Sequence, residues 1–285
     1  MAVRPHPRPD HPSDSPFRTK EYQDVIAYLR QMGAGTIPPK WSDRPQWEMP
    51  HVHLFLMASL ENTYLYADWA VENKDLINYL GYADISFFQV YKHHSTEEEY
   101  VFPTWSEKAG DDIWLRNIEE HHTFETPLHA GWHYVRYQRS RLVIDPSPIP
   151  EPKDDHLDMS QYPDLDLEKP FDPIAFRRHM ASFVFPLVKH LGAEISTLAP
   201  ELIEKVGQGV LKEIMSSVEK DYKSYNPSWF LCAAYTSAPM DICKQLIPLP
   251  WILRRVLLPF VFGPKYRNLW LYAPHPENLT WNGSA

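Results

Sequence analysis

Pairs of a histidine and a glutamate four residues apart are the strongest chemical signal in this sequence. There are four of them: His93/Glu97, His94/Glu98, His121/Glu125 and His190/Glu194. The 285 residues include 14 histidines and 19 glutamates, for which chance placement would give about one such pair. On a helix this spacing places both side chains on one face, one turn apart. An imidazole and a carboxylate that converge in this way can bind a metal ion.

The residues around these pairs predict four amphipathic helices. We expect them over residues 50–73, 84–105, 112–141 and 173–198, each with one histidine on its apolar stripe. On the first helix we prefer His53 to His51, because Leu56 and Leu60 follow His53 on the same face.

The second helix has an inward stripe of Val90, His93, Glu97 and Tyr100 at spacings of three, four and three. His94 rotates away from this stripe, so we expect it behind the ligands or at the surface. For Glu98 the pattern leaves a buried and a solvated position equally open, whereas Glu99 is expected in solvent.

The third and fourth helices each place a glutamate one turn after a histidine. Glu125 follows His121 and Glu194 follows His190, on otherwise apolar stripes. A carboxylate on such a stripe is costly to bury without a partner, which favours a ligand role for both. Pro127 lies inside the third helix and is expected to bend it.

The expected fold is therefore all-α, a four-helix bundle around a metal centre. Four inward histidines with up to three carboxylates are too many ligands for one tetrahedral zinc ion. They suit two five- or six-coordinate ions, and ligation by imidazole and carboxylate without cysteine favours iron or manganese.

The helix motifs resemble those of a known family. The run HHSTEEEYVFP resembles the HHxxEExxxFP pattern of the hemerythrin-like, or HHE cation-binding, family, while NIEEHHTFETPL and VKHLGAEISTL resemble its third and fourth helices. The resemblance covers about residues 48–200 and extends to long fungal members. It implies an antiparallel bundle that binds two iron ions through His53, His93, His121 and His190, bridged by Glu97 and Glu194.

Glu125 departs from the oxygen-carrying members of that family, which have a histidine there. A further carboxylate makes the site harder and more anionic, which shifts the expectation from reversible O2 carriage toward O2 activation. We expect an O2-dependent oxidoreductase that acts on a small organic substrate. The alternative is a protein that binds or senses O2, NO or iron without turnover, and a sealed site would favour it. A bundle without metal that serves as a scaffold is the third reading.

The rest of the chain is expected to flank this bundle. Residues 1–47 form a Pro-rich segment and a short helix, residues 142–173 a long loop that straps or covers one end, and residues 201–285 a helix and an aromatic cap. A net charge of −9 argues against nucleic acid as a partner. No apolar run is long enough to span a membrane, and two cysteines indicate a reducing, cytoplasmic setting. Nothing in the sequence indicates an oligomeric state.

Overall fold

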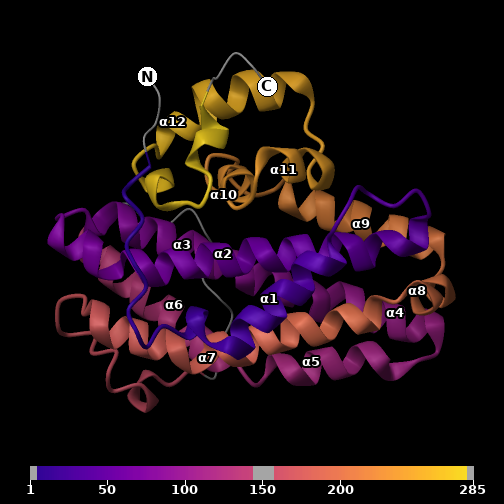
Figure 1. Ribbon diagram of the computed structural model, residues 1–285, viewed down its shortest axis with the longest axis horizontal. Coiled ribbons are helices and arrows are strands. Elements are labelled where there is room, and N and C mark those ends of the chain that lie inside the picture. Colours follow the sequence, from indigo (N-terminus) through magenta and orange to yellow (C-terminus); the bar gives the residue numbers. More distant parts are fainter. Residues whose placement is uncertain (1–4, 144–156, 281–285) are drawn as a thin grey trace.

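A computed structural model describes residues 5–143 and 157–280, and this part of the chain is helical without any strand (Figure 1). The all-α prediction is confirmed. The larger helices are α1 (Lys20–Met32), α2 (Arg44–Glu72), α3 (Leu76–Thr96), α4 (Phe102–Ala109), α5 (Leu115–His121), α6 (Glu125–Ser140), α7 (Pro173–Glu194), α8 (Pro200–Val206) and α9 (Gln208–Tyr222). The C-terminal region holds α10 (Phe230–Thr236), α11 (Met240–Leu246), a π-helix at Leu253–Phe262, α12 (Gly263–Lys265) and 3-10 turns at Leu269–Tyr272 and Pro276–Leu279.

Four helices enclose the main core. Helix α2 packs against α3 and α7, and α6 packs against the same two helices. In Figure 1 these helices run along the long axis of the molecule, and α1 lies against α2 and α7 from outside. Aromatic side chains fill much of the interior, and Phe87 contacts both Phe176 and Phe183.

The starts of two helices follow from their capping residues. The Thr19 hydroxyl accepts a hydrogen bond from the Tyr22 amide at the start of α1. The Asp172 carboxylate accepts bonds from the first free amides of α7, and Pro173 occupies the first position, where no amide hydrogen is needed. These caps fix where α7, which carries two candidate ligands, enters the core.

The prediction of one helix over residues 112–141 is wrong. Residues 122–124 interrupt it, so that α5 ends at His121 and α6 begins at Glu125. Pro127 gives a physical reason, because a proline ring is tolerated in the first turn of a helix but clashes with the preceding turn in its interior. Phe124 fills the break and is 1% exposed.

The prediction for the end of the second helix needs a similar correction. After α3, residues Glu97–Val101 form a π-helical turn, which holds more residues per turn than an α-helix. The extra residue rotates the later positions of the helix, so Tyr100, which was expected inside, is 50% exposed. Glu97 comes before the shift takes effect and stays buried.

Two further segments cover the four helices. Residues 157–172 lie against α6 and α7, where Phe171 packs on Tyr134 and Phe176; residues 144–156 of the predicted loop lie outside the described part. The C-terminal region packs on α2 and α3 through the turn at Leu269–Tyr272. No helix among the described residues is long and apolar enough to cross a membrane.

Candidate metal centre

Seven buried side chains gather in two adjoining groups between the helices. The first group is His53 from α2, His93 and Glu97 from α3 and the turn after it, and Glu194 from α7. The second group is His94, His121 and His190, from α3, α5 and α7. In each group, one potential ligand atom per residue lies within 4.8 Å of all the others. Each group could hold a metal ion.

In the first group a backbone carbonyl holds one histidine ring, whereas the atoms that could bind a metal have no hydrogen-bond partner within the described chain. His53 donates from Nδ1 to the Leu191 carbonyl at 2.8 Å, which turns its Nε2 toward Glu194 Oε2 at 3.8 Å. His93 Nε2 lies 3.4 Å from Glu97 Oε1. All four residues are at most 8% exposed. Within the described chain, the two Nε2 atoms and all four carboxylate oxygens have no hydrogen-bond partner.

The electrostatics of this group favour metal ligation. Burial lowers the pKa of His53 and of His93 to about 3, so both rings are neutral at pH 7 and offer a lone pair. Burial, together with the facing carboxylate of Glu194, raises the pKa of Glu97 well above its usual range. For Glu194 burial opposes ionisation, but the nearby His53 and His190 imidazoles outweigh it and lower its pKa. A cation would satisfy both carboxylates at once.

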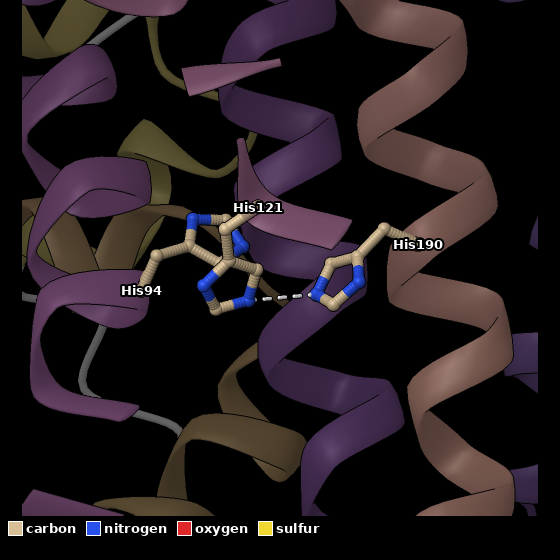
Figure 2. Close-up of side chains that lie close together, drawn as sticks. All are labelled: His94, His121 and His190. Atoms are coloured by element: carbon tan, nitrogen blue, oxygen red, sulfur yellow. Dashed lines mark hydrogen bonds between the residues drawn. The ribbon is translucent and has the colours of Figure 1, made fainter. Parts of the chain in front are cut away.

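The second group has three imidazoles whose rings converge (Figure 2). The ring centroids of His94 and His121 are 4.5 Å apart, as are those of His121 and His190. The Nε2 atoms of His121 and His190 face each other at 3.0 Å. Neither ring nitrogen of His94 has a hydrogen-bond partner in the described structure, and burial places its pKa well below the usual value.

Two glutamates outside the groups orient the second one. His121 Nδ1 lies 2.6 Å from Glu98 Oε1, and His190 Nδ1 lies 3.0 Å from Glu120 Oε2. An ionised carboxylate only accepts, so both Nδ1 atoms carry the hydrogen. The two facing Nε2 atoms then each present a lone pair, unless one of them is protonated. A carboxylate behind an imidazole in this way is the usual support of a metal-binding histidine.

The pKa directions indicate which ring takes that proton. Burial works against charging His190, but Glu194 and Glu120 outweigh it and raise its pKa. Burial and the His190 charge lower the pKa of His121 to about 3. Of the two facing rings, His190 therefore takes up a proton more readily than His121, at a place where a metal ion could bind instead.

The two groups meet along the carboxylates. Glu194 Oε2 is 3.3 Å from His190 Nε2 as well as 3.8 Å from His53 Nε2. Glu97 Oε2 is 3.9 Å from His121 Nε2, while its Oε1 faces His93. Each carboxylate therefore lies between one histidine of the first group and one of the second.

Glu125 is the predicted site residue that the structure does not bring into either group. Its carboxylate is about one-third exposed and lies near His122 at 3.6 Å and His129 at 3.9 Å. The break before α6 turns it away from the direction that a continuous helix would give. It instead lines a small pocket with Tyr91, His94, His121, Phe124, Leu128 and His129, which has room for about one water molecule.

Three side chains in or beside the second group were not predicted from the sequence patterns to belong there. His94 was expected behind the ligands or at the surface, yet it lies at the centre of the second group. Glu98 had a signal of its own, since it stands four residues after His94. Glu120 had none beyond its place beside His121. The other predicted ligands, His53, His93, Glu97, His121, His190 and Glu194, all lie in the two groups.

Comparison with known proteins finds one distant relative but does not identify a family. No protein-family model matches the chain, and no solved structure matches it significantly. A protein of Cryptosporiopsis sp. (strain 8999), named dimeric xanthone biosynthesis cluster protein R11, is 20% identical over 231 residues, which are 80% of this chain and 77% of that protein. The hemerythrin-like resemblance thus stays a prediction.

Proposed function

We propose that the two groups are the halves of one dinuclear metal centre. Five histidines would bind the two ions, two on one side and three on the other, and Glu97 and Glu194 would bridge them. The observation that carries this proposal is the set of buried ligand atoms without hydrogen-bond partners in the described chain. Leaving so many polar atoms unpaired is costly, and two cations would remove that cost.

Iron is the metal that this donor set suits best, with manganese as the alternative. Imidazole nitrogen is a ligand of intermediate hardness, carboxylate oxygen is a hard ligand, and neither group includes a thiolate. In this proposal α2, α3, α5 with α6, and α7 form the antiparallel four-helix bundle of the hemerythrin-like family.

The protein would act as an O2-dependent oxidoreductase on a small organic substrate. Bound iron would supply the redox chemistry with O2, while the chain supplies the ligands and excludes water. Support for an enzyme comes from the relative, whose name places it in a biosynthesis cluster. Phe124, Leu128 and Tyr91 give the pocket beside His94 an apolar wall, and Glu125 adds an acceptor at its rim.

The size of that pocket supports a second function. A space for about one water molecule admits a diatomic gas more readily than an organic substrate. The alternative is therefore a protein that binds O2 or NO without turnover.

Oxygen uptake separates the two functions. The protein is loaded with iron, reduced chemically and mixed with O2 in the presence of a reductant and a panel of small aromatic compounds. An oxidoreductase should consume O2 continuously, and one of the compounds should accelerate the consumption, whereas a binding protein should take up at most one O2 per centre.

His121→Ala should abolish either response. His122→Ala is the matched control, because His122 is its neighbour but its side chain is 69% exposed. Iron-loaded protein that consumes no O2 and binds neither O2 nor NO contradicts both proposed functions.

A further inference from the structure

The C-terminal region carries a dense patch of exposed apolar side chains. Trp251, Ile252, Phe260 and Val261 are 62%, 57%, 59% and 52% exposed. Elsewhere in the described chain, large apolar residues that are more than half exposed occur singly, such as Ile174 and Met215. Single exposed apolar residues are ordinary, but a cluster within 11 positions indicates an interaction surface.

The other side of the same segment is anchored. Leu258, in the middle of the π-helix Leu253–Phe262, is 0% exposed, and Gly263 just after it is buried. A side chain on Gly263 would come within 3.2 Å of Leu279, which shows how closely this segment lies against the turn at Pro276–Leu279. The apolar patch is thus the outward face of an element that is already packed on the molecule.

The charge around the patch differs from that of the rest of the chain. Residues 242–276 contain five basic side chains, Lys244, Arg254, Arg255, Lys265 and Arg267, and no Asp or Glu. The whole chain has a net charge of −9. Asp241 and Glu277 border this run, which is itself basic and apolar in an acidic protein. Such a segment favours a negatively charged partner with an apolar layer.

We propose that this face docks on an anionic phospholipid surface, with residues 251–267 lying in the headgroup layer. Tryptophan and phenylalanine side chains insert at that depth, and neighbouring arginine and lysine side chains contact the lipid phosphates. The protein lies on the membrane without spanning it, in keeping with the absence of a membrane-spanning helix in the described chain.

The same charge argues against a second copy of the chain as the occupant. A symmetric dimer through this face would bring two sets of basic side chains together. In Figure 1 the C-terminal elements stack over α2 and α3 and form one edge of the molecule, so a flat surface can reach them. The proposal is independent of the metal centre.

Flotation with vesicles tests it on the full-length chain. The vesicles are phosphatidylcholine alone, or phosphatidylcholine with phosphatidylserine. We expect binding to the anionic vesicles, weaker binding at high salt, and little binding to neutral ones. Trp251→Ser with Phe260→Ser should lower the partition onto anionic vesicles by about tenfold or more. Lys265→Glu with Arg267→Glu should lower it as well.

Matched controls keep the outcome interpretable. Ile174→Ser removes an apolar side chain that is 59% exposed, as Phe260 is, but lies on α7. Lys223→Glu changes an exposed charge outside residues 242–276. Both should bind vesicles as the unmodified protein does, and circular dichroism confirms that all variants are folded. Absence of binding to anionic vesicles, or binding that the Trp251→Ser, Phe260→Ser variant retains, overturns the proposal. So does a dimer, seen by analytical ultracentrifugation, that this double substitution dissociates.

Discussion

The central feature at the scale of residues is a set of polar atoms that the fold buries and then leaves unpaired. His94 offers two bare ring nitrogens, and both oxygens of Glu97 and of Glu194 have no hydrogen-bond partner within the described chain. Each such group costs about 1–3 kcal/mol when it is buried without a partner. A fold that keeps several of them together is more readily explained by ions that bind there than by chance.

The first prediction compares His94 with Glu125. His94→Ala should lower the iron content of the protein, since it removes one of the three candidate ligands of the second group. Glu125→Ala should leave the iron content close to that of the unmodified protein, because its carboxylate lies outside both groups. Elemental analysis of the purified variants measures this. The opposite result would restore the ligand role that the sequence pattern predicts for Glu125.

The second prediction concerns pH and uses metal-free protein. Burial lowers the pKa of His53 from 6.5 to about 3. A depressed pKa means that the stabilising contribution is complete above pH 6.5 and is lost as the pH falls, because the unfolded chain binds the proton first. From pH 7 to pH 5 this one histidine should lower the free energy of unfolding by about 2 kcal/mol. In His53→Asn the loss over the same interval should be smaller by that amount, as measured by urea unfolding. An equal loss of unfolding free energy in the unmodified protein and in His53→Asn would contradict the lowered pKa of His53.

Spacing identified most of the candidate ligands but not their full environment. The four-residue repeats pointed to six of the seven side chains in the two groups, and His53 was added from its apolar neighbours. His94 was not predicted as a ligand, because it lies off the apolar stripe and we assumed that the helix has a single inward face. Helix α3 packs against α2 on one side and α6 on the other, so His93 and His94 can both be buried on different faces.

At the scale of elements, the position of α7 controls both groups. Its Leu191 carbonyl fixes His53, and its Glu194 and His190 give one candidate ligand to the first and to the second group. Gly192 lies between them and lets α1 approach, since a side chain there would come within 2.7 Å of Val25. Close packing of α1 on α7 therefore helps to hold the centre together.

The third prediction tests that contact. Gly192→Ala should lower the free energy of unfolding by about 1–3 kcal/mol, because the added methyl group overpacks the contact with Val25. Val25→Ala in the same chain should recover part of the loss. Gly209→Ala is the control: nothing lies within 4 Å of the added carbon, so it should be neutral or stabilise by up to about 1 kcal/mol. Chemical denaturation of the three variants measures these free energies of unfolding. An unchanged value for Gly192→Ala would show that α1 can shift to accommodate the added methyl group without cost.

Helical periodicity predicted the presence of the long helices and missed their irregular points. The π-helical turn at Glu97–Val101 and the break at residues 122–124 both depend on what packs around them. Phe124 in the break contacts the rings of His94 and His190, a contact between three distant segments that no local pattern reveals. Pro127 was the one local signal of the break, and it was interpreted as a bend.

At the scale of the whole molecule, the C-terminal region is packed against the helices that carry the site. Leu269 meets Gly81 of α3, and Asn62 of α2 donates to the Tyr272 carbonyl at 2.8 Å. The Tyr272 hydroxyl donates to Asp75 just before α3. Such contacts favour unfolding of the region together with α2 and α3.

The fourth prediction rests on that packing. Leu269→Ala should lower the free energy of unfolding by about 2–5 kcal/mol, because Leu269 is 4% exposed and its loss leaves a cavity. Far-ultraviolet circular dichroism and the absorbance of the iron-loaded centre should change in one transition in this variant. Val261→Ala, at a position 52% exposed, should have little effect. Two separate transitions would show that the C-terminal region unfolds on its own.

The most direct test of the dinuclear centre is the number of iron ions per chain. Protein purified with iron and freed of loosely bound metal should contain two per chain. His121→Ala should contain fewer, and His122→Ala should still contain two. A chain that binds no iron or manganese, or a His121→Ala variant that keeps the full complement, would contradict the assignment of these seven side chains to a metal centre.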